Sequence, residues 1–138
     1  MTPTLAVPPP GAAVWKWALG LYWMALMVAT HWPGATVNVV PGLRLDLLIH
    51  IGAYAGLAGL MALAGLGAGW RAGRAVLLIT AVAGALALLD EATQAIPVVR
   101  RTFDPDDLIA DLAGGVLGAA VGLAIARRGA KDGQQSSR

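Results

Sequence analysis

Seven of the eight acidic residues fall in three short stretches of the chain, and each stretch carries other polar side chains. Carboxylates, amides and imidazoles at helical spacings can hold divalent cations or accept protons as general bases. The candidate binding residues are Asp46, His50, Glu91, Gln94, Arg101, Asp104, Asp107 and Asp111, and the candidate metal ligands are His50, Glu91, Asp107 and Asp111. The pattern assigns no catalytic residue, because no obvious nucleophile lies among them.

The acids around Pro105 also have a structural explanation. Asp104 before Pro105 is typical of a helix N-cap followed by proline at the first helical position. Asp106 and Asp107 would then lie in the first turn, where the helix dipole favours negative charge. Asp111 lies a turn deeper, where capping does not explain it. Inside a membrane its charge must be paired, hydrated or hydrogen-bonded within the bundle, so a ligand role and a structural role stay open.

Asp90 and Glu91 stand near the end of an apolar segment, where the exposed carbonyls of a helix disfavour carboxylates. We therefore expect an offsetting partner, which would be Arg100 or Arg101, a bound cation, or a proton on one carboxyl. Gln94 follows Glu91 by about one turn and can share its face.

The two histidines differ in the residues around them. His50 follows Asp46 by four residues, so this acid could orient the ring, and Tyr54 continues the same stripe. A solvated interfacial histidine is the alternative for His50. His31 has no comparable neighbours in the sequence, so we expect it to be an interfacial residue without a role in the cluster.

The composition indicates a membrane protein. Of 138 residues, 57% are hydrophobic and 13% are charged, against roughly 25% charged in soluble domains. The absence of cysteine excludes disulfides, thiolate metal sites and cysteine nucleophiles. The net charge is +2, and the basic residues are scattered at segment ends, so we expect no nucleic-acid partner.

Four apolar segments predict an all-α, antiparallel four-helix transmembrane bundle. They span about residues 12–32, 45–66, 75–96 and 105–126, and short turns between them force successive helices to run in opposite directions. Residues 1–11 would be a flexible tail, 12–126 the membrane domain, and 127–138 a basic and polar tail that frays. A signal peptide is the alternative for the first segment, but that segment lacks a basic start and a clear cleavage site.

The basic residues predict the orientation in the membrane. With both termini in the cytoplasm, the inner side holds seven basic residues and the outer side three. The inner set is Lys16, Arg71, Arg74, Arg127, Arg128, Lys131 and Arg138, and the outer set is Arg44, Arg100 and Arg101. The seven clustered acids then lie on the outer face of a plasma membrane.

Glycines repeat every four residues in two of the segments. Gly114, Gly118 and Gly122 do so in the last segment, and Gly52 and Gly56 in the second. This spacing lets helix backbones approach closely, so we expect these glycines to serve packing.

Three blocks of residues resemble the VanZ-like family over about residues 44–120. In the family pattern a D-K-x-x-H block opens one helix, an E-x-x-Q block closes the next, and an R-x-x-D-x-x-D-x-x-x-N-x-x-G-x-x-x-G block opens the last. The matching residues here are Asp46 and His50, Glu91 and Gln94, and Arg101, Asp104, Asp107, Gly114 and Gly118. The chain departs from the pattern at Leu47, where lysine is usual, and at Asp111, where asparagine is usual.

The resemblance implies a bacterial envelope membrane protein, in a family named for a protein associated with low-level resistance to the glycopeptide antibiotic teicoplanin. An outward-facing pocket would bind a membrane lipid headgroup, a lipid-linked cell-wall precursor or a glycopeptide, with Arg100 and Arg101 contacting phosphate or carboxylate. A metal-dependent hydrolase or transferase that uses a divalent cation is one alternative, and a structural or accessory subunit is another.

Overall fold

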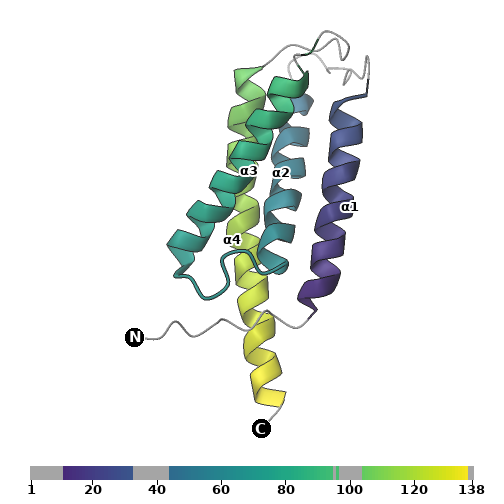
Figure 1. The fold of residues 1–138 in the computed structure, drawn as a ribbon. Coiled ribbons are helices and arrows are strands. Elements are labelled where there is room, and N and C mark those ends of the chain that lie inside the picture. The colour runs from purple at the N-terminus through teal and green to yellow at the C-terminus, as the bar shows by residue number, and fades with distance from the viewer. Residues whose placement is uncertain (1–10, 33–43, 95, 97–103, 137–138) are drawn as a thin grey trace.

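A computed structural model of the chain describes residues 11–32, 44–94, 96 and 104–136. Within these ranges it forms four helices and no strand: α1 (Ala12–Thr30), α2 (Leu45–Leu63), α3 (Ala72–Gln94) and α4 (Pro105–Ser136) (Figure 1). A 19-residue helix such as α1 or α2 is about 28 Å long, close to the roughly 30 Å hydrocarbon core of a bilayer. All four helices are long and apolar enough to cross a membrane, which confirms the predicted all-helical, multi-pass architecture.

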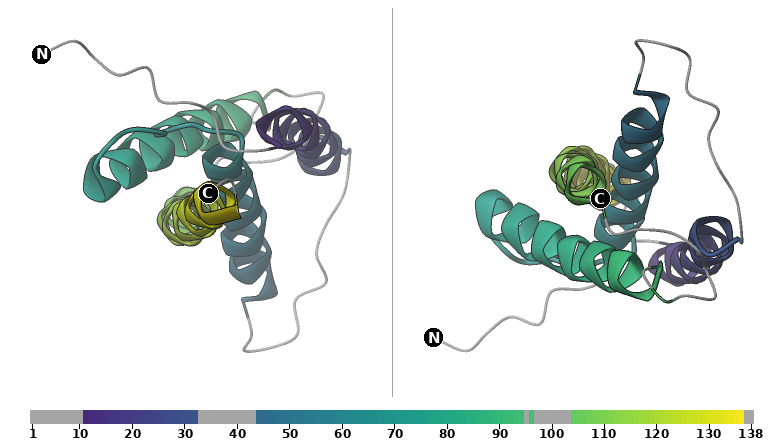
Figure 2. Two further views of the ribbon diagram at one scale, coloured as in Figure 1. Left: turned by 90° about the horizontal axis from the view of Figure 1, so that it is seen from below. Right: turned by 90° about the horizontal axis from the view of Figure 1, so that it is seen from above.

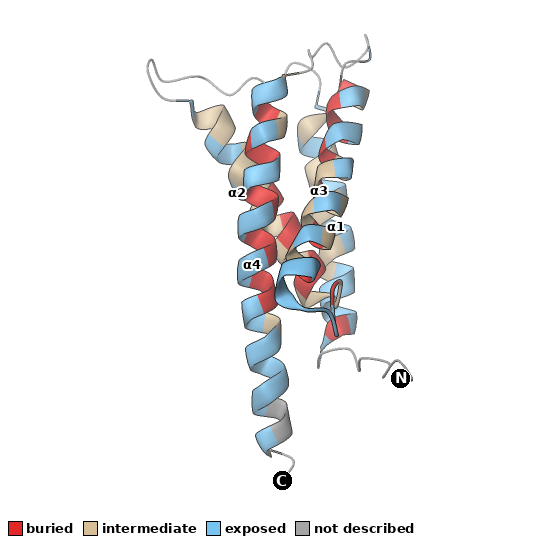
Figure 3. Cartoon of the chain, turned by 90° about the vertical axis from the view of Figure 1, so that its left-hand side faces the viewer, coloured by how far each residue is buried: buried red, intermediate tan, exposed pale blue. Residues whose placement is uncertain are grey.

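The outer surface of α1 suits lipid better than water. Its exposed side chains include Val14, Trp17, Leu21, Met24 and Val28, which form one stripe at helical spacing. Leaving such surface in water costs about 25 cal/mol per Å², whereas lipid tails accept it. In Figure 3 the buried positions of α4 recur turn after turn along the helix, and most of the other described positions are exposed.

The closest helix contact joins α2 and α4, and three glycines of α4 make it. A Cβ atom at each would collide with the backbone of α2: at Gly114 with Ile51, at Gly118 with Ala55, and at Gly122 with Gly59. Both sets of residues repeat every four positions, so the two backbones stay in contact over two turns. The packing role predicted for the α4 glycines is confirmed.

Of the two α2 glycines, only Gly56 lies in a close contact, so the predicted packing role is confirmed there and not at Gly52. A Cβ at Gly52 would meet nothing within 4 Å, and one at Gly56 would lie 2.6 Å from the Tyr22 hydroxyl of α1 rather than near α4. The Tyr22 hydroxyl also donates a hydrogen bond to the Ala53 carbonyl at 2.8 Å. Gly56 therefore makes room for α1, which packs on α2 and α3 (Figure 2).

The segment boundaries differ from the sequence-based expectation mainly in α4. This helix continues to Ser136, where we expected the chain after residue 126 to fray. The Arg127 guanidinium donates a hydrogen bond to the Trp70 carbonyl at 2.9 Å, which ties the extension to the turn after α2. That turn contains three glycines with positive φ, at Gly65, Gly67 and Gly69, and α2 accordingly ends at Leu63 rather than near residue 66.

The last turns of α1 and α3 and the first turns of α2 and α4 lie together at one end of the molecule, at the top of Figure 1. Hydrogen bonds and ion pairs link them: Thr30 to Asp90, Asp104 to Glu91, and His50 to Asp111. This end carries the candidate residues.

Candidate functional site

Buried polar residues gather at the end where these four helices meet. We name as the polar cluster His50 of α2, Asp90, Glu91 and Gln94 of α3, and Asp107 and Asp111 of α4. Asp90, Glu91 and Asp111 are each 2% exposed, and Gln94 is 1% exposed. Carboxyl groups are almost never buried to this degree without partners, so their contacts decide what the cluster can do.

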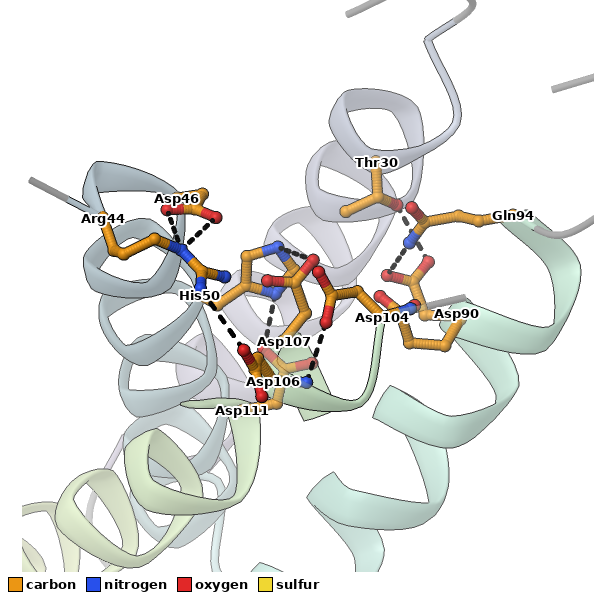
Figure 4. Close-up of polar contacts among 11 residues, drawn as sticks. Thr30, Arg44, Asp46, His50, Asp90, Gln94, Asp104, Asp106, Asp107 and Asp111 are labelled. Carbon is orange, nitrogen blue, oxygen red and sulfur yellow. Dashed lines mark hydrogen bonds and ion pairs between the residues drawn. The ribbon is translucent and has the colours of Figure 1, made fainter. Parts of the chain in front are cut away.

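The His50 ring lies between two acids of α4. Its Nδ1 is 2.9 Å from Asp111 Oδ1, and its Nε2 is 3.5 Å from Asp107 Oδ2 (Figure 4). Asp107 and Asp111 are four residues apart, so both project from the same face of α4. The close contact of α2 and α4 at Gly114 lies directly below this pair and holds His50 against Asp111.

Asp46 does not orient His50, contrary to the sequence-based hypothesis. Its carboxylate accepts from Arg44 Nε at 3.2 Å, and Arg44 also reaches Asp106 at 3.3 Å. These hydrogen bonds raise the pKa of the Arg44 guanidinium, and the hydrogen bond to Asp46 has the largest effect. Close packing of α4 on α2 brings Asp111 nearer to His50 than Asp46 is, although Asp46 is only four residues away in the sequence. Asp46 belongs instead to a separate and more exposed ionic group.

Glu91 is held by the start of α4. Its Oε2 accepts a hydrogen bond from the Asp104 backbone N–H at 3.1 Å. The positive end of the α4 dipole therefore offsets the unfavourable position of Glu91 near the end of α3. Asp104 acts as the predicted N-cap, because its Oδ1 accepts from the Asp106 N–H at 2.9 Å. The Asp104 side chain is thus engaged in the fold.

Asp90 connects α3 to α1, a link that the sequence reasoning missed. Its carboxyl accepts from Gln94 Nε2 at 2.8 Å and from Thr30 Oγ1 at 2.8 Å. His31 lies close by, with Nδ1 3.5 Å from Asp90 Oδ1 and Nε2 2.9 Å from Thr93 Oγ1. The expectation that His31 stands alone was wrong. The expected topology puts the ends of α1 and α3 on the same side of the membrane, and this would have suggested that His31 lies near Asp90.

Tyr54 lies beneath the cluster and is 1% exposed. Among the described residues, its hydroxyl has no hydrogen-bond partner. Tyr54 follows His50 by four residues, so it lies on the same face of α2 one turn deeper in the bundle. A buried hydroxyl normally finds a partner, so this group is available to an atom that the described residues do not supply.

Three members of the polar cluster could hold a metal ion. His50, Glu91 and Asp111 each offer one ligand atom, and these three atoms lie within 4.8 Å of one another. Asp107, the other predicted metal ligand, contacts the same imidazole. Of the other predicted residues, Gln94 bonds to Asp90, whereas Arg101 lies outside the described residues, as does Arg100.

The family model described as VanZ/LLP1 matches residues 16–126 of the chain, which includes all described members of the polar cluster. This match agrees with the resemblance carried by the three sequence blocks. No curated protein and no solved structure matches the chain.

Proposed function

The chain belongs to the VanZ/LLP1 family, and from this premise we propose that it is a multi-pass protein of the bacterial plasma membrane that binds an envelope molecule at the polar cluster. The bound group would be the head of a membrane lipid, a lipid-linked cell-wall precursor or a glycopeptide such as teicoplanin. The observation that carries the proposal is the burial of three carboxyl groups, those of Glu91, Asp107 and Asp111, around the His50 imidazole at the junction of three helices.

The proposed orientation places the cluster on the extracytoplasmic side, with antiparallel helices and both termini in the cytoplasm. The distribution of described basic residues supports it. Arg44 is the one described Lys or Arg at the cluster end, and the opposite end holds Lys16, Arg71, Arg74, Arg127, Arg128 and Lys131. Such a bias favours the basic end as cytoplasmic.

The orientation is directly testable because the chain contains no cysteine. Two variants each carry a single cysteine, one in place of Ile96 beside the cluster and one in place of Lys131 at the far end of α4. Intact cells that express either variant are treated with a membrane-impermeant maleimide. We expect labelling of the cysteine at 96 alone until the cells are opened. Labelling of the cysteine at 131 alone would reverse the orientation.

The sign of the cluster limits how a ligand can bind. Within the described residues the buried carboxyls face no Lys or Arg, since Arg44 bonds to Asp46 and Asp106. Positive charge for these carboxyls would come with the ligand, as an ammonium group, from a cation held between the cluster and a phosphate or carboxylate, or from arginines outside the described residues. Arg101 remains the predicted direct contact for an anionic group.

The binding experiment uses the purified protein in lipid nanodiscs. Anionic and zwitterionic phospholipids, isoprenoid-linked wall precursor and teicoplanin are each titrated against the native chain and the Asp111→Asn and Arg101→Ala variants. The control is Asp132→Asn, which removes an exposed acid at the opposite end. For at least one of these ligands, we expect the Asp111→Asn variant to bind at least about tenfold more weakly than the native chain. The Arg101→Ala variant would either bind as the native chain does or be weakened as well. Equal binding by all four proteins would refute the proposal.

A metal-dependent hydrolase or transferase is a second candidate, favoured by the group formed by His50, Glu91 and Asp111. Turnover of phospholipid or isoprenoid phosphate by the metal-loaded protein, lost in Glu91→Gln, would establish it. If the protein binds the substrate but does not turn it over, the enzyme function fails and the binding function stands. If Glu91→Gln changes thermal stability but neither binding nor turnover, the cluster has a structural role.

A further inference from the structure

The deepest part of the polar cluster combines one imidazole with two carboxyl groups from three different helices. We propose that His50, Glu91 and Asp111 together bind one divalent transition-metal ion, of which Zn²⁺ and Mn²⁺ are the best suited. This inference deepens the proposed function, because the ion would supply the positive charge that an anionic head group needs. It rests on the geometry of the cluster and on the Tyr54 hydroxyl beside it.

The spacing of two of the ligand atoms matches a single ion, and the third lies close enough to reach it by a small movement of its side chain. The three atoms lie within 4.8 Å of one another, and His50 Nδ1 is 2.9 Å from Asp111 Oδ1. Two ligands at right angles around an ion, with bonds of about 2.1 Å, lie about 3 Å apart. An ion can therefore replace the hydrogen between these two atoms with little movement of either side chain.

The third ligand is already oriented by the backbone. The Asp104 N–H holds Glu91 Oε2 at 3.1 Å, and Asp107 contacts His50 Nε2 at 3.5 Å. Hydrogen bonds from outside the coordination sphere orient ligands in this way in known metal sites. The start of α4 therefore supplies one ligand, Asp111, and positions the two that come from α2 and α3.

Tyr54 provides the second, independent observation. Its buried hydroxyl has no hydrogen-bond partner among the described residues, and Tyr54 lies one turn below His50 on the same face of α2. Three protein ligands leave coordination positions open for water or for an atom of a ligand. An oxygen bound at one of these positions would give the Tyr54 hydroxyl the partner that the described chain does not provide.

Charge and ligand type select the class of ion. Carboxylates at membrane depth are costly unless they are paired, and a divalent ion offsets the charges of Glu91 and Asp111 together. Ca²⁺ and Mg²⁺ prefer sets made of oxygen alone, whereas a mixture of one imidazole nitrogen and two carboxylate oxygens suits Zn²⁺ or Mn²⁺.

The test measures metal binding in the absence of any head group. The purified full-length protein is stripped with a chelator and titrated with Zn²⁺, Mn²⁺, Mg²⁺ and Ca²⁺ by calorimetry. We expect about one Zn²⁺ or Mn²⁺ per chain and much weaker binding of Mg²⁺ and Ca²⁺. His50→Ala, Glu91→Gln and Asp111→Asn should each weaken Zn²⁺ binding by at least about tenfold, the lower end of the effect seen even for outer-shell partners.

Matched controls separate the site from general effects. His31→Ala removes the other histidine at the same end, and Asp46→Asn removes an acid outside the cluster, so both should bind Zn²⁺ as the native chain does. Tyr54→Phe keeps all three ligands and should bind one ion. Asp111→Asn preserves the shape of the side chain, and circular dichroism establishes that the variant is folded. Absence of Zn²⁺ and Mn²⁺ binding, or equal binding by the folded Asp111→Asn and His50→Ala variants, would overturn the inference.

The outcome also separates this inference from the proposed function. If the native protein binds no ion but still binds a head group in chelator, the metal site is wrong and the binding function stands. If it binds Zn²⁺ at the three ligands but no head group with the metal present, the metal site stands and the binding function fails.

Discussion

Gly118 is the position at which a single methyl group should do the most damage. It lies where the backbones of α4 and α2 touch, and an added Cβ would lie 2.7 Å from the carbonyl carbon of Ala55. Ordinary contacts begin at 3.4 Å, so the atoms are 0.7 Å too close. The obstruction is backbone rather than a flexible side chain, so the helices must move apart.

The expected cost of Gly118→Ala follows from two opposing effects. Overpacking costs about 1–3 kcal/mol when the backbone must shift. Alanine gains about 0.8–1.0 kcal/mol over glycine in helix propensity, which reduces the loss but does not cancel a clash with backbone. We therefore expect a net destabilisation of up to about 2 kcal/mol.

Gly115 is the matched control, three residues away on the same helix. A Cβ there would lie 3.6 Å from Ala83 Cβ, an ordinary contact. Gly115→Ala should therefore be neutral or more stable than the native chain by up to about 1 kcal/mol. The two variants make the same chemical change in the same helix and are expected to differ in sign.

Thermal and denaturant unfolding in one detergent, followed by circular dichroism, compares the three proteins. A second reading is the affinity for Zn²⁺, which should fall in Gly118→Ala because separation of α2 from α4 moves His50 away from Asp111. If Gly118→Ala is as stable as Gly115→Ala, the helices are not in backbone contact and the register described here is wrong.

Three other substitutions test single contacts. Tyr22→Phe removes the hydrogen bond to the Ala53 carbonyl and should lower stability in detergent by about 0.6 kcal/mol and at most about 1.7 kcal/mol, the average and the maximum for hydrogen bonds between membrane helices. Thr30→Val removes a donor to Asp90 and should cost about 1–3 kcal/mol in the same unfolding assay, with Zn²⁺ affinity unchanged. Arg44→Ala removes an exposed ion pair and should leave the unfolding midpoint unchanged at high salt, because exposed pairs contribute little.

The helices and their shared polar end could be predicted because each depends on a strong local pattern. An apolar run of about 20 residues has few structural options in a membrane. Once the turns are short, the ends of alternate segments must lie on the same face. The Asp104 cap and Pro105 likewise depend on residues adjacent in the chain, and the structure has α4 starting at Pro105. The ligand role of the cluster stays a prediction.

The errors concern contacts between helices, which a periodic pattern does not determine. Gly52 and Gly56 have the same spacing as the α4 glycines, yet the stripe that meets α4 contains Ile51 and Ala55, one position earlier. A rotation of the helix by one residue decides which stripe is used, and the volumes of all neighbouring side chains set that rotation. His31 was misplaced for the same reason, because its partner Thr93 is 62 residues away in the chain.

The small residues of α4 also explain how a polar cluster of this kind can be held at a membrane surface. Gly114 and Gly118 place α4 against α2, and Gly115 on the adjoining face lies opposite Ala83 of α3 with room for one methyl group. A helix in backbone contact with one neighbour and packed against a second has little freedom to tilt or rotate. The side chains at its first turns are therefore fixed relative to His50 of α2 and Glu91 of α3. Larger residues along α4 would leave the same carboxyls in the sequence but not at ligand distance from one another.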